Sequence, residues 1–105
     1  MKINNIFSNI PEIIPEEILD ILIESGSCRV ERIISKGQKT PEGEWYDQDE
    51  NEFVIIIKGY AKLSFKDKII KMEEGDWINI PAHTKHRVEK TNPEKETIWL
   101  AIYYK

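Results

Sequence analysis

From residue 28 onward, the chain is a series of short segments rich in strand-forming residues, each closed by a turn. Gly, Pro, Asn or Asp stands between these apolar and β-branched segments, which cover residues 28–35, 52–58, 60–65, 69–72, 77–80, 86–90 and 97–103. Short strands separated by such turns are typical of small all-β sandwiches and barrels. The pattern therefore predicts an all-β fold for the larger part of the chain.

The segment 52–58 is apolar on both of its faces. Glu52, Val54 and Ile56 share one face, and Phe53, Ile55 and Ile57 share the other. A strand of this kind needs cover on both sides. We expect Val54 and Ile56 to lie at a pocket inside the barrel. The opposite face is expected to meet another sheet layer or a second subunit, which makes a homodimer the expected assembly.

The segment 15–25 carries the features of a short helix. Proline followed by two glutamates suits a first helical turn, glycine at 26 suits the end, and one apolar stripe comprises Ile18, Leu19, Leu22 and Ile23. We therefore expect a lead-in and helix over residues 1–26 and a barrel over residues 27–105, within one domain. The helix is expected to cover the barrel or to join the dimer interface.

Composition excludes several classes of function. The chain has 105 residues and a net charge of −4, so the concentrated basic surface that nucleic acid or an anionic membrane requires is not expected. No apolar run reaches the length of a membrane span, and Pro11 interrupts the N-terminal segment. The single cysteine, Cys28, cannot form an intrachain disulfide. A cytoplasmic protein is the expectation.

The segment Gly75–His86 carries the clearest motif. Gly75, Pro81 and His86 fit the second cupin motif, G-x5-P-x-G-x2-H-x3-N, while His83 and Lys90 stand at its glycine and asparagine positions. Over roughly residues 27–104 the chain resembles small single-domain bacterial cupins. The resemblance implies a double-stranded β-helix, also called a jelly roll.

The first cupin motif, G-x5-H-x-H-x3,4-E-x6-G, is present only in its second half. Glu52 and Gly59 fit it, and the leading glycine is absent. With the shorter spacing Tyr46 and Gln48 take the two histidine positions, and with the longer spacing Trp45 and Asp47 take them. The part of the motif that supports the fold is therefore kept, and the part that binds metal is altered.

The remaining polar residues suggest a mixed nitrogen and oxygen site. On a regular strand Tyr46, Gln48 and Glu52 would share a face, and a neighbouring strand could bring His86 beside them. Such a set suits divalent Mn, Fe, Ni or Zn, and a single imidazole favours the harder ion Mn. Asp47 and His83 are alternative ligands.

Without a metal, the same residues have simpler roles. His86 would be a hydrogen-bonded strand residue, and Glu52 would pair with Arg87, Arg32 or Lys85, because a buried carboxylate is costly without a partner. Trp45 is expected to form a wall of the pocket, and Trp77 either fills the core or lines the pocket.

Two functions therefore stay open at this stage. The first is a cupin that binds a divalent metal and a small molecule in its barrel, with Lewis-acid polarisation of a substrate oxygen as the candidate chemistry. The second is a metal-free module that binds a small molecule or a protein partner. The residues select no reaction, so whether the chain is an enzyme is left open.

Overall fold

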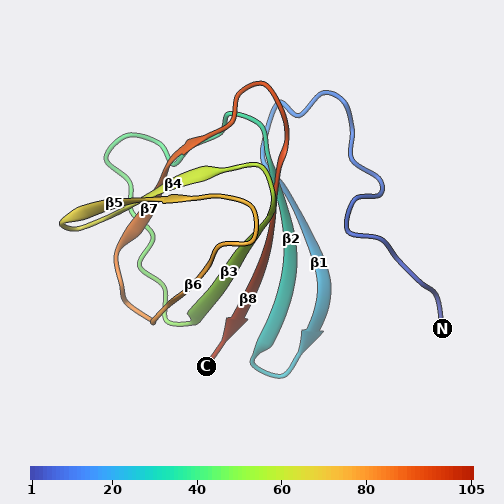
Figure 1. The fold of residues 1–105 in the computed structure, drawn as a ribbon. Helices are drawn as coiled ribbons and strands as arrows, with labels where there is room; N and C mark the ends of the chain where they lie inside the picture. The colour runs from blue at the N-terminus through green and yellow to red at the C-terminus, as the bar shows by residue number, and fades with distance from the viewer.

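Eight antiparallel strands form two sheets that face each other in a double-stranded β-helix (Figure 1). The computed structural model describes all 105 residues. The five-stranded sheet has the order β1-β2-β8-β3-β6, and the three-stranded sheet has the order β5-β4-β7. The strands are β1 (Ile18–Ser25), β2 (Cys28–Ser35), β3 (Asn51–Lys58), β4 (Ala61–Phe65), β5 (Lys68–Met72), β6 (Trp77–Ile80), β7 (His86–Thr91) and β8 (Thr97–Tyr104).

The predicted strands are confirmed, and the predicted helix is wrong. Residues 18–25 form the strand β1, which pairs antiparallel with β2 from Ile18↔Ile34 to Ser25↔Cys28. A register shift between Ile21 and Ile23 adds a residue to β1, so its apolar residues do not alternate strictly and imitate a helical stripe. The hydrogen bonds available along β2 decide the conformation of this short segment, against its local pattern.

The core lies between the two sheets. On β3, Val54 and Ile56 point inward and are almost fully buried, whereas Phe53 and Ile55 are only partly buried on the outer face. The inward residues pack in a cluster with Ala61, Leu63, Met72, Ile80, Trp99 and Ala101. This alternation also turns Glu52, the first inward residue of β3, toward the interior.

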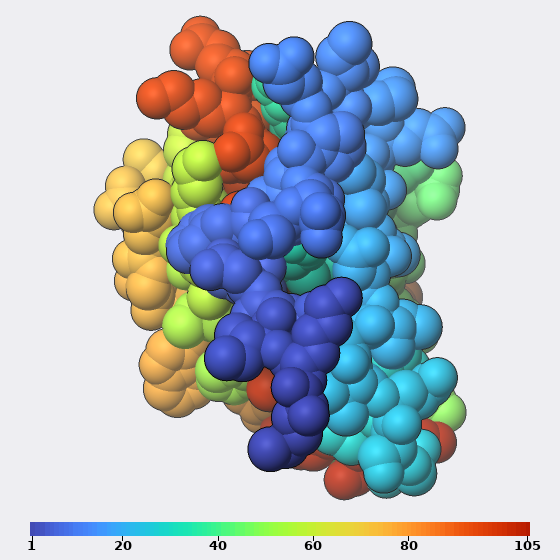
Figure 2. Space-filling model, turned by 90° about the vertical axis from the view of Figure 1, so that its right-hand side faces the viewer, coloured from blue at the N-terminus to red at the C-terminus, as the bar shows by residue number.

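The segment before β1 lies against the outside of the five-stranded sheet (Figure 2). The Arg32 side chain on β2 holds it there, because Nη1 donates to the carbonyl oxygens of Ile6 and Ser8 at 3.0 and 2.6 Å. The same guanidinium donates to Asp20 Oδ2 at 2.8 Å. The structure contains no helix of the length and apolarity that crossing a membrane requires.

Candidate functional site

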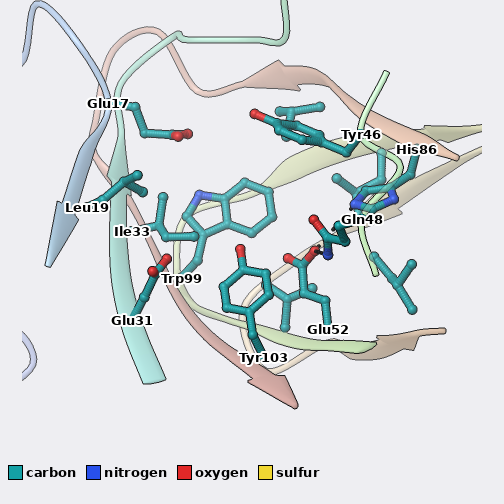
Figure 3. A pocket seen from close by; sticks show the side chains of 14 residues that line it. Glu17, Leu19, Glu31, Ile33, Tyr46, Gln48, Glu52, His86, Trp99 and Tyr103 are labelled. Atoms are coloured by element: carbon teal, nitrogen blue, oxygen red, sulfur yellow. Dashed lines mark hydrogen bonds and ion pairs between the residues drawn. The ribbon is translucent and has the colours of Figure 1, made fainter. Parts of the chain in front are cut away.

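A cavity of about 140 Å³ opens between the two sheets (Figure 3). Its apolar walls come from side chains such as Val54, Leu63 and Ile80. The polar side chains that line it are Glu17, Glu31, Tyr46, Gln48, Glu52, His86 and Tyr103. A concave, mostly apolar space with a few converging polar groups is the usual form of a small-molecule site.

The first strand residue of β7 and the loop before β3 bring the polar end of the cavity together. Tyr46 forms a two-way bridge with His86: the Tyr46 N–H donates to the His86 carbonyl at 2.8 Å, and the His86 N–H donates back at 3.1 Å. The Tyr46 and His86 rings lie 5.6 Å apart. The bridge fixes which loop residues face inward.

Arg87 holds the start of the same loop. Its side chain is buried, and its guanidinium donates to the carbonyl oxygens of Thr40, Pro41 and Glu44 at 2.9, 3.3 and 3.5 Å. These carbonyls precede Tyr46 directly in the chain. Arg87 therefore positions the loop and is not available to the Glu52 carboxylate.

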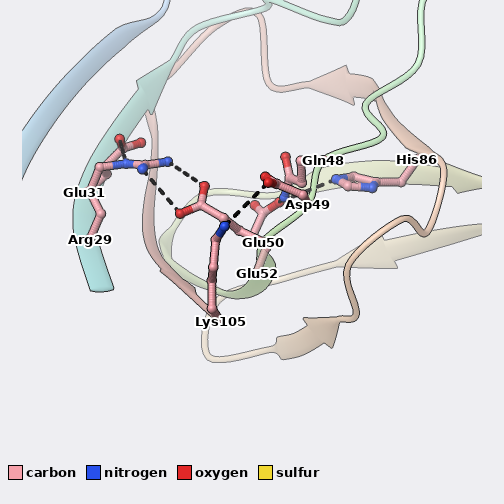
Figure 4. A network of polar contacts seen from close by, with 8 residues as sticks. All are labelled: Arg29, Glu31, Gln48, Asp49, Glu50, Glu52, His86 and Lys105. Atoms are coloured by element: carbon pink, nitrogen blue, oxygen red, sulfur yellow. Dashed lines mark hydrogen bonds and ion pairs between the residues drawn. The ribbon is translucent and has the colours of Figure 1, made fainter. Parts of the chain in front are cut away.

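His86 presents one defined nitrogen to the cavity. Its Nδ1 lies 2.8 Å from the Thr84 carbonyl oxygen, an acceptor only, so Nδ1 carries a proton. In the neutral imidazole, Nε2 then holds a lone pair, and it lies 3.3 Å from Glu52 Oε1. A second group, the Gln48 Nε2 amide, donates to that same Oε1 at 3.0 Å (Figure 4).

Glu52 is buried and has no ion pair with lysine or arginine. The sequence-based expectation that Glu52 pairs with Arg87, Arg32 or Lys85 is wrong. The Arg87 and Arg32 side chains are bound to other groups, and the partner of Glu52 is His86. Burial by itself lowers the pKa of His86. Hydrogen bonds with Glu52 and the Thr84 carbonyl raise this pKa by more than burial lowers it, so the net shift is upward.

The structure decides between the two spacings of the first motif. Tyr46, Gln48 and Glu52 line the cavity together with His86, as the shorter spacing predicts. Asp47 points outward, and its Oδ1 lies 3.0 Å from Nδ1 of the exposed His83. Asp47 and His83 therefore lie outside the cavity and form a separate surface pair.

The structure places one of the four expected pocket walls at this cavity. Val54 lines the cavity. Ile56 is in the sealed core, since β3 carries it past the end of the cavity. Trp77 is 62% exposed on the outer face beside Phe53, because Ile78 and Ile80 take the inward positions of β6. Trp45 lies outside as well, with the Arg87 guanidinium 5.9 Å from its ring.

Sequence reasoning did not place Glu17, Glu31, Trp99 or Tyr103 at the cavity, which all four of them line. Strict alternation along β8 was the available signal, because Trp99 and Tyr103 share a face with the buried Ala101. Burial raises the pKa of Tyr103 far above its ordinary value, so its phenol keeps its proton. Burial also raises the pKa of Glu17, against its hydrogen bond with Ser35.

The cavity brings together two side chains of the kinds that commonly coordinate metal ions, His86 and Glu52. No group of three or more His, Cys, Asp or Glu side chains converges in the structure. Two strong donors, His86 Nε2 and the Glu52 carboxylate, face each other, and two ligands held at right angles at about 2.1 Å from an ion would lie about 3.0 Å apart. The Gln48 amide adds an oxygen donor if it is turned over.

The comparisons with known proteins agree with this architecture. A family model described as "Cupin domain" matches residues 30–103. No curated protein matches the chain. Among solved structures, a provisionally assigned mannose-6-phosphate isomerase from Ralstonia eutropha JMP134 is 38% identical, with a TM-score of 0.95 over 99% of this chain and 98% of that one.

Two more distant structures share the fold alone. A cupin superfamily protein from Desulfitobacterium hafniense DCB-2 is 18% identical, with a TM-score of 0.75 over 90% of this chain and 83% of its own. A conserved protein of unknown function from Streptococcus pyogenes is 17% identical, with a TM-score of 0.76 over 99% of this chain and 87% of its own.

Proposed function

The chain belongs to the cupin family, and we propose that its barrel binds a divalent metal ion and, beside it, a small polar molecule that carries no phosphate group. One observation carries the proposal. The buried Glu52 carboxylate has no positive partner except the His86 imidazole, whose Nε2 faces it at 3.3 Å. A buried carboxylate needs a nearby positive charge, which is either a proton on His86 or a metal ion in its place.

His86, Glu52 and Gln48 would hold the ion, with the Tyr46 phenol as a further oxygen donor. The hydrogen bond from His86 Nδ1 to the Thr84 carbonyl fixes the ring and its tautomer, as partners of metal-binding histidines commonly do. One imidazole among oxygen donors favours Mn or Fe over Zn, because sulfur and nitrogen donors are scarce here. When bound, the ion supplies Lewis-acid polarisation of an oxygen of the bound molecule.

The other cavity residues support binding of the organic molecule. The Tyr103 phenol retains its proton and can donate to a ligand oxygen, and the Trp99 indole forms a flat wall. In Figure 3, Glu17 and Glu31 occupy the end away from His86 and add acceptors for ligand hydroxyl or ammonium groups. These groups suit an uncharged or cationic molecule.

A phosphorylated sugar has no evident partner in the cavity. Neither lysine nor arginine lines it, and the nearby Arg29 guanidinium is already engaged by Glu31 at 2.7 Å and Glu50 at 3.3 Å. Phosphate groups are usually held by arginine, lysine or clustered backbone N–H groups. The substrate in the name of the Ralstonia protein is therefore not carried over to this chain.

A metal-free binding module is the second candidate, and the Gln48 amide favours it. Its Nε2 already donates to Glu52, so that His86, Glu52 and Gln48 form a closed set of hydrogen bonds without an ion. In this case the cavity would bind the organic molecule alone.

Titration with Mn²⁺, followed by the loss of the free-ion EPR signal, separates the two candidates. The metal proposal predicts about one Mn²⁺ bound per chain, with binding lost in Glu52→Gln and His86→Ala. His83→Ala is the matched control, because this second histidine lies outside the cavity, and it should bind as the parent does. If the parent binds neither Mn²⁺ nor Fe²⁺, Ni²⁺ or Zn²⁺, the metal proposal fails and the metal-free module remains.

A further inference from the structure

We propose that the organic molecule in the cavity is a small amine, bound as its ammonium ion at the end that Glu17 and Glu31 form. This inference rests on the function proposed for the cavity and names the chemical class of its ligand. In Figure 3, the two carboxylates project into the space from one side, and His86 and Glu52 lie on the opposite side. The end formed by Glu17 and Glu31 therefore only accepts hydrogen bonds when both carboxyl groups are ionised.

The Glu17 carboxylate is held by neutral groups alone. The hydroxyl of the buried Ser35 donates to Glu17 Oε2 at 3.1 Å, and the Trp99 indole N–H donates to the same hydroxyl oxygen at 3.2 Å. None of the ion pairs in the structure includes Glu17. Trp99 and Ser35 thus fix the position of this carboxylate without neutralising its charge.

Glu31 shares its cation with another acid. Glu31 Oε2 lies 2.7 Å from Arg29 Nε, and the same guanidinium lies 3.3 Å from Glu50 Oε1. One guanidinium between two carboxylates leaves one negative charge in excess. Glu31 is only 8% exposed, so water and salt screen this charge less than they screen a surface charge.

The polar lining therefore carries negative charge that an uncharged ligand would leave unbalanced. Glu17 contributes one charge and the group around Arg29 another, and neither lysine nor arginine lines the cavity. Burial raises the pKa of Glu17, a hydrogen bond from Ser35 opposes this, and the charges of Glu31 and Glu52 raise it further. Carboxylates that are partly withdrawn from water need a nearby positive charge, and a cationic ligand supplies it.

The wall between the two ends of the cavity also suits a cation. Trp99 and Tyr103 lie there, between Glu31 and Glu52 (Figure 3). The face of an aromatic ring attracts a cation, and tryptophan does so most strongly. Tyr103 already has such a contact, since the Arg29 guanidinium lies 4.4 Å from its ring centroid. An alkylammonium ion would find carboxylates for its N–H groups and aromatic surface for its alkyl chain.

Titration of the ¹⁵N-labelled, metal-free protein with n-butylamine, which is an ammonium ion at neutral pH, tests the proposal. The matched probes are 1-butanol and sodium butyrate, which have the same chain length but carry no charge or a negative charge. Butylamine should shift the Trp99 indole N–H signal saturably, and the other two should bind at least roughly tenfold more weakly. The signals of the exposed Trp45 and Trp77 should not move.

One pair of variants locates the ammonium ion. Glu17→Gln preserves the size of the side chain and removes its charge, and it should weaken butylamine binding by roughly tenfold or more. Glu16→Gln is the matched control, because it removes the same charge from a neighbour that does not line the cavity, and it should bind butylamine as the parent does. The spread of the amide signals shows that each variant is folded.

Three results would overturn the inference: butylamine that leaves the Trp99 signal unmoved, 1-butanol that binds as tightly as butylamine, or an equal loss of affinity in Glu16→Gln. The last would mean that the net charge of the chain attracts the amine. Because this titration uses no metal, it is independent of the Mn²⁺ titration. Bound Mn²⁺ without amine binding would refute this inference alone, and amine binding without Mn²⁺ would refute only the metal part of the proposed function.

Discussion

At the residue scale, one pair of side chains decides the chemistry of the cavity. Glu52 and His86 lie 34 positions apart in the chain, and the pairing of the strands brings Glu52 Oε1 on β3 within 3.3 Å of His86 Nε2 on β7. The sequence motifs predicted both residues but left open whether Gln48 or Asp47 faces inward. They did not predict that Asp47 would pair with His83, which occupies a glycine position of the motif with a φ of 62°. Histidine is among the residues that tolerate this left-handed conformation.

The pair predicts a pH dependence of stability in the metal-free protein. The pKa of His86 is raised above its ordinary 6.5, so the folded state binds this proton more tightly than the unfolded chain. Its contribution to the free energy of unfolding is complete below pH 6.5 and is lost as the pH rises through the raised pKa. Urea unfolding between pH 6 and 8.5 should show this fall in the parent and a flatter curve in His86→Asn. Parallel curves would contradict the role of the pair.

Gln48 predicts a gain of metal affinity. The substitution Gln48→His places a second imidazole beside Glu52. Imidazole is a stronger donor than an amide oxygen for Ni²⁺ and Zn²⁺, so the affinity for these ions should rise by roughly tenfold or more. Asp47→His is the matched control, since this neighbour points outward, and it should leave the affinity unchanged. Calorimetric titration measures both, and a control that tightens binding as much as Gln48→His would refute the assignment of the inward residue.

At the element scale, the strands from β2 onward were predictable and β1 was not. In β2 to β8 the turn residues and the β-branched content agree with the pairing that the sheets form. In β1 the bulge between Ile21 and Ile23 breaks the alternation, and pairing with β2, a tertiary effect, decides the outcome. Trp77 shows the opposite case: it was expected in the core or at the pocket, whereas strand alternation with the inward Ile78 and Ile80 turns it outward.

The turn between β3 and β4 predicts a large effect of one methyl group. Gly59 has a φ of 92°, and a Cβ there would lie 2.6 Å from Thr97 Oγ1 and 2.9 Å from Thr97 Cα. Gly59→Ala should lower the free energy of unfolding by about 3 kcal/mol or more, from backbone strain and overlap together. Gly43→Ala, at a φ of 82° with open space around it, should lose only about 1–2 kcal/mol. If denaturant unfolding showed equal losses of stability for Gly59→Ala and Gly43→Ala, the overlap with Thr97 would have no energetic cost, and the prediction would be wrong.

At the scale of the whole molecule, the distribution of charge narrows the ligand class. The net charge of −4 agrees with an acidic cavity in which Glu17, Glu31 and Glu52 outnumber basic groups. The sequence gives the sign of the net charge of the chain, but only the pairing of the strands shows which carboxylates line the same cavity. Glu31, from β2, and Glu52, from β3, both line the cavity, although β8 lies between their two strands in the sheet.

Mannose 6-phosphate is therefore expected not to bind. The Trp99 indole N–H, which donates to Ser35 Oγ at 3.2 Å beside the cavity, offers a separate NMR signal. Millimolar mannose 6-phosphate should leave this signal unmoved, with or without Zn²⁺, because no free lysine or arginine is present to hold the phosphate. A saturable shift would show that the cavity accepts a sugar phosphate.

The most direct test of a metal-binding cupin is the metal content of the protein as it is purified, without a His-tag or chelator. Elemental analysis of the parent beside Glu52→Ala and His86→Ala should find about one divalent transition metal per chain in the parent and none in either variant. A parent without metal, even after incubation with Mn, Fe, Ni and Zn, would contradict the account. The cavity would then be a site for an organic molecule alone.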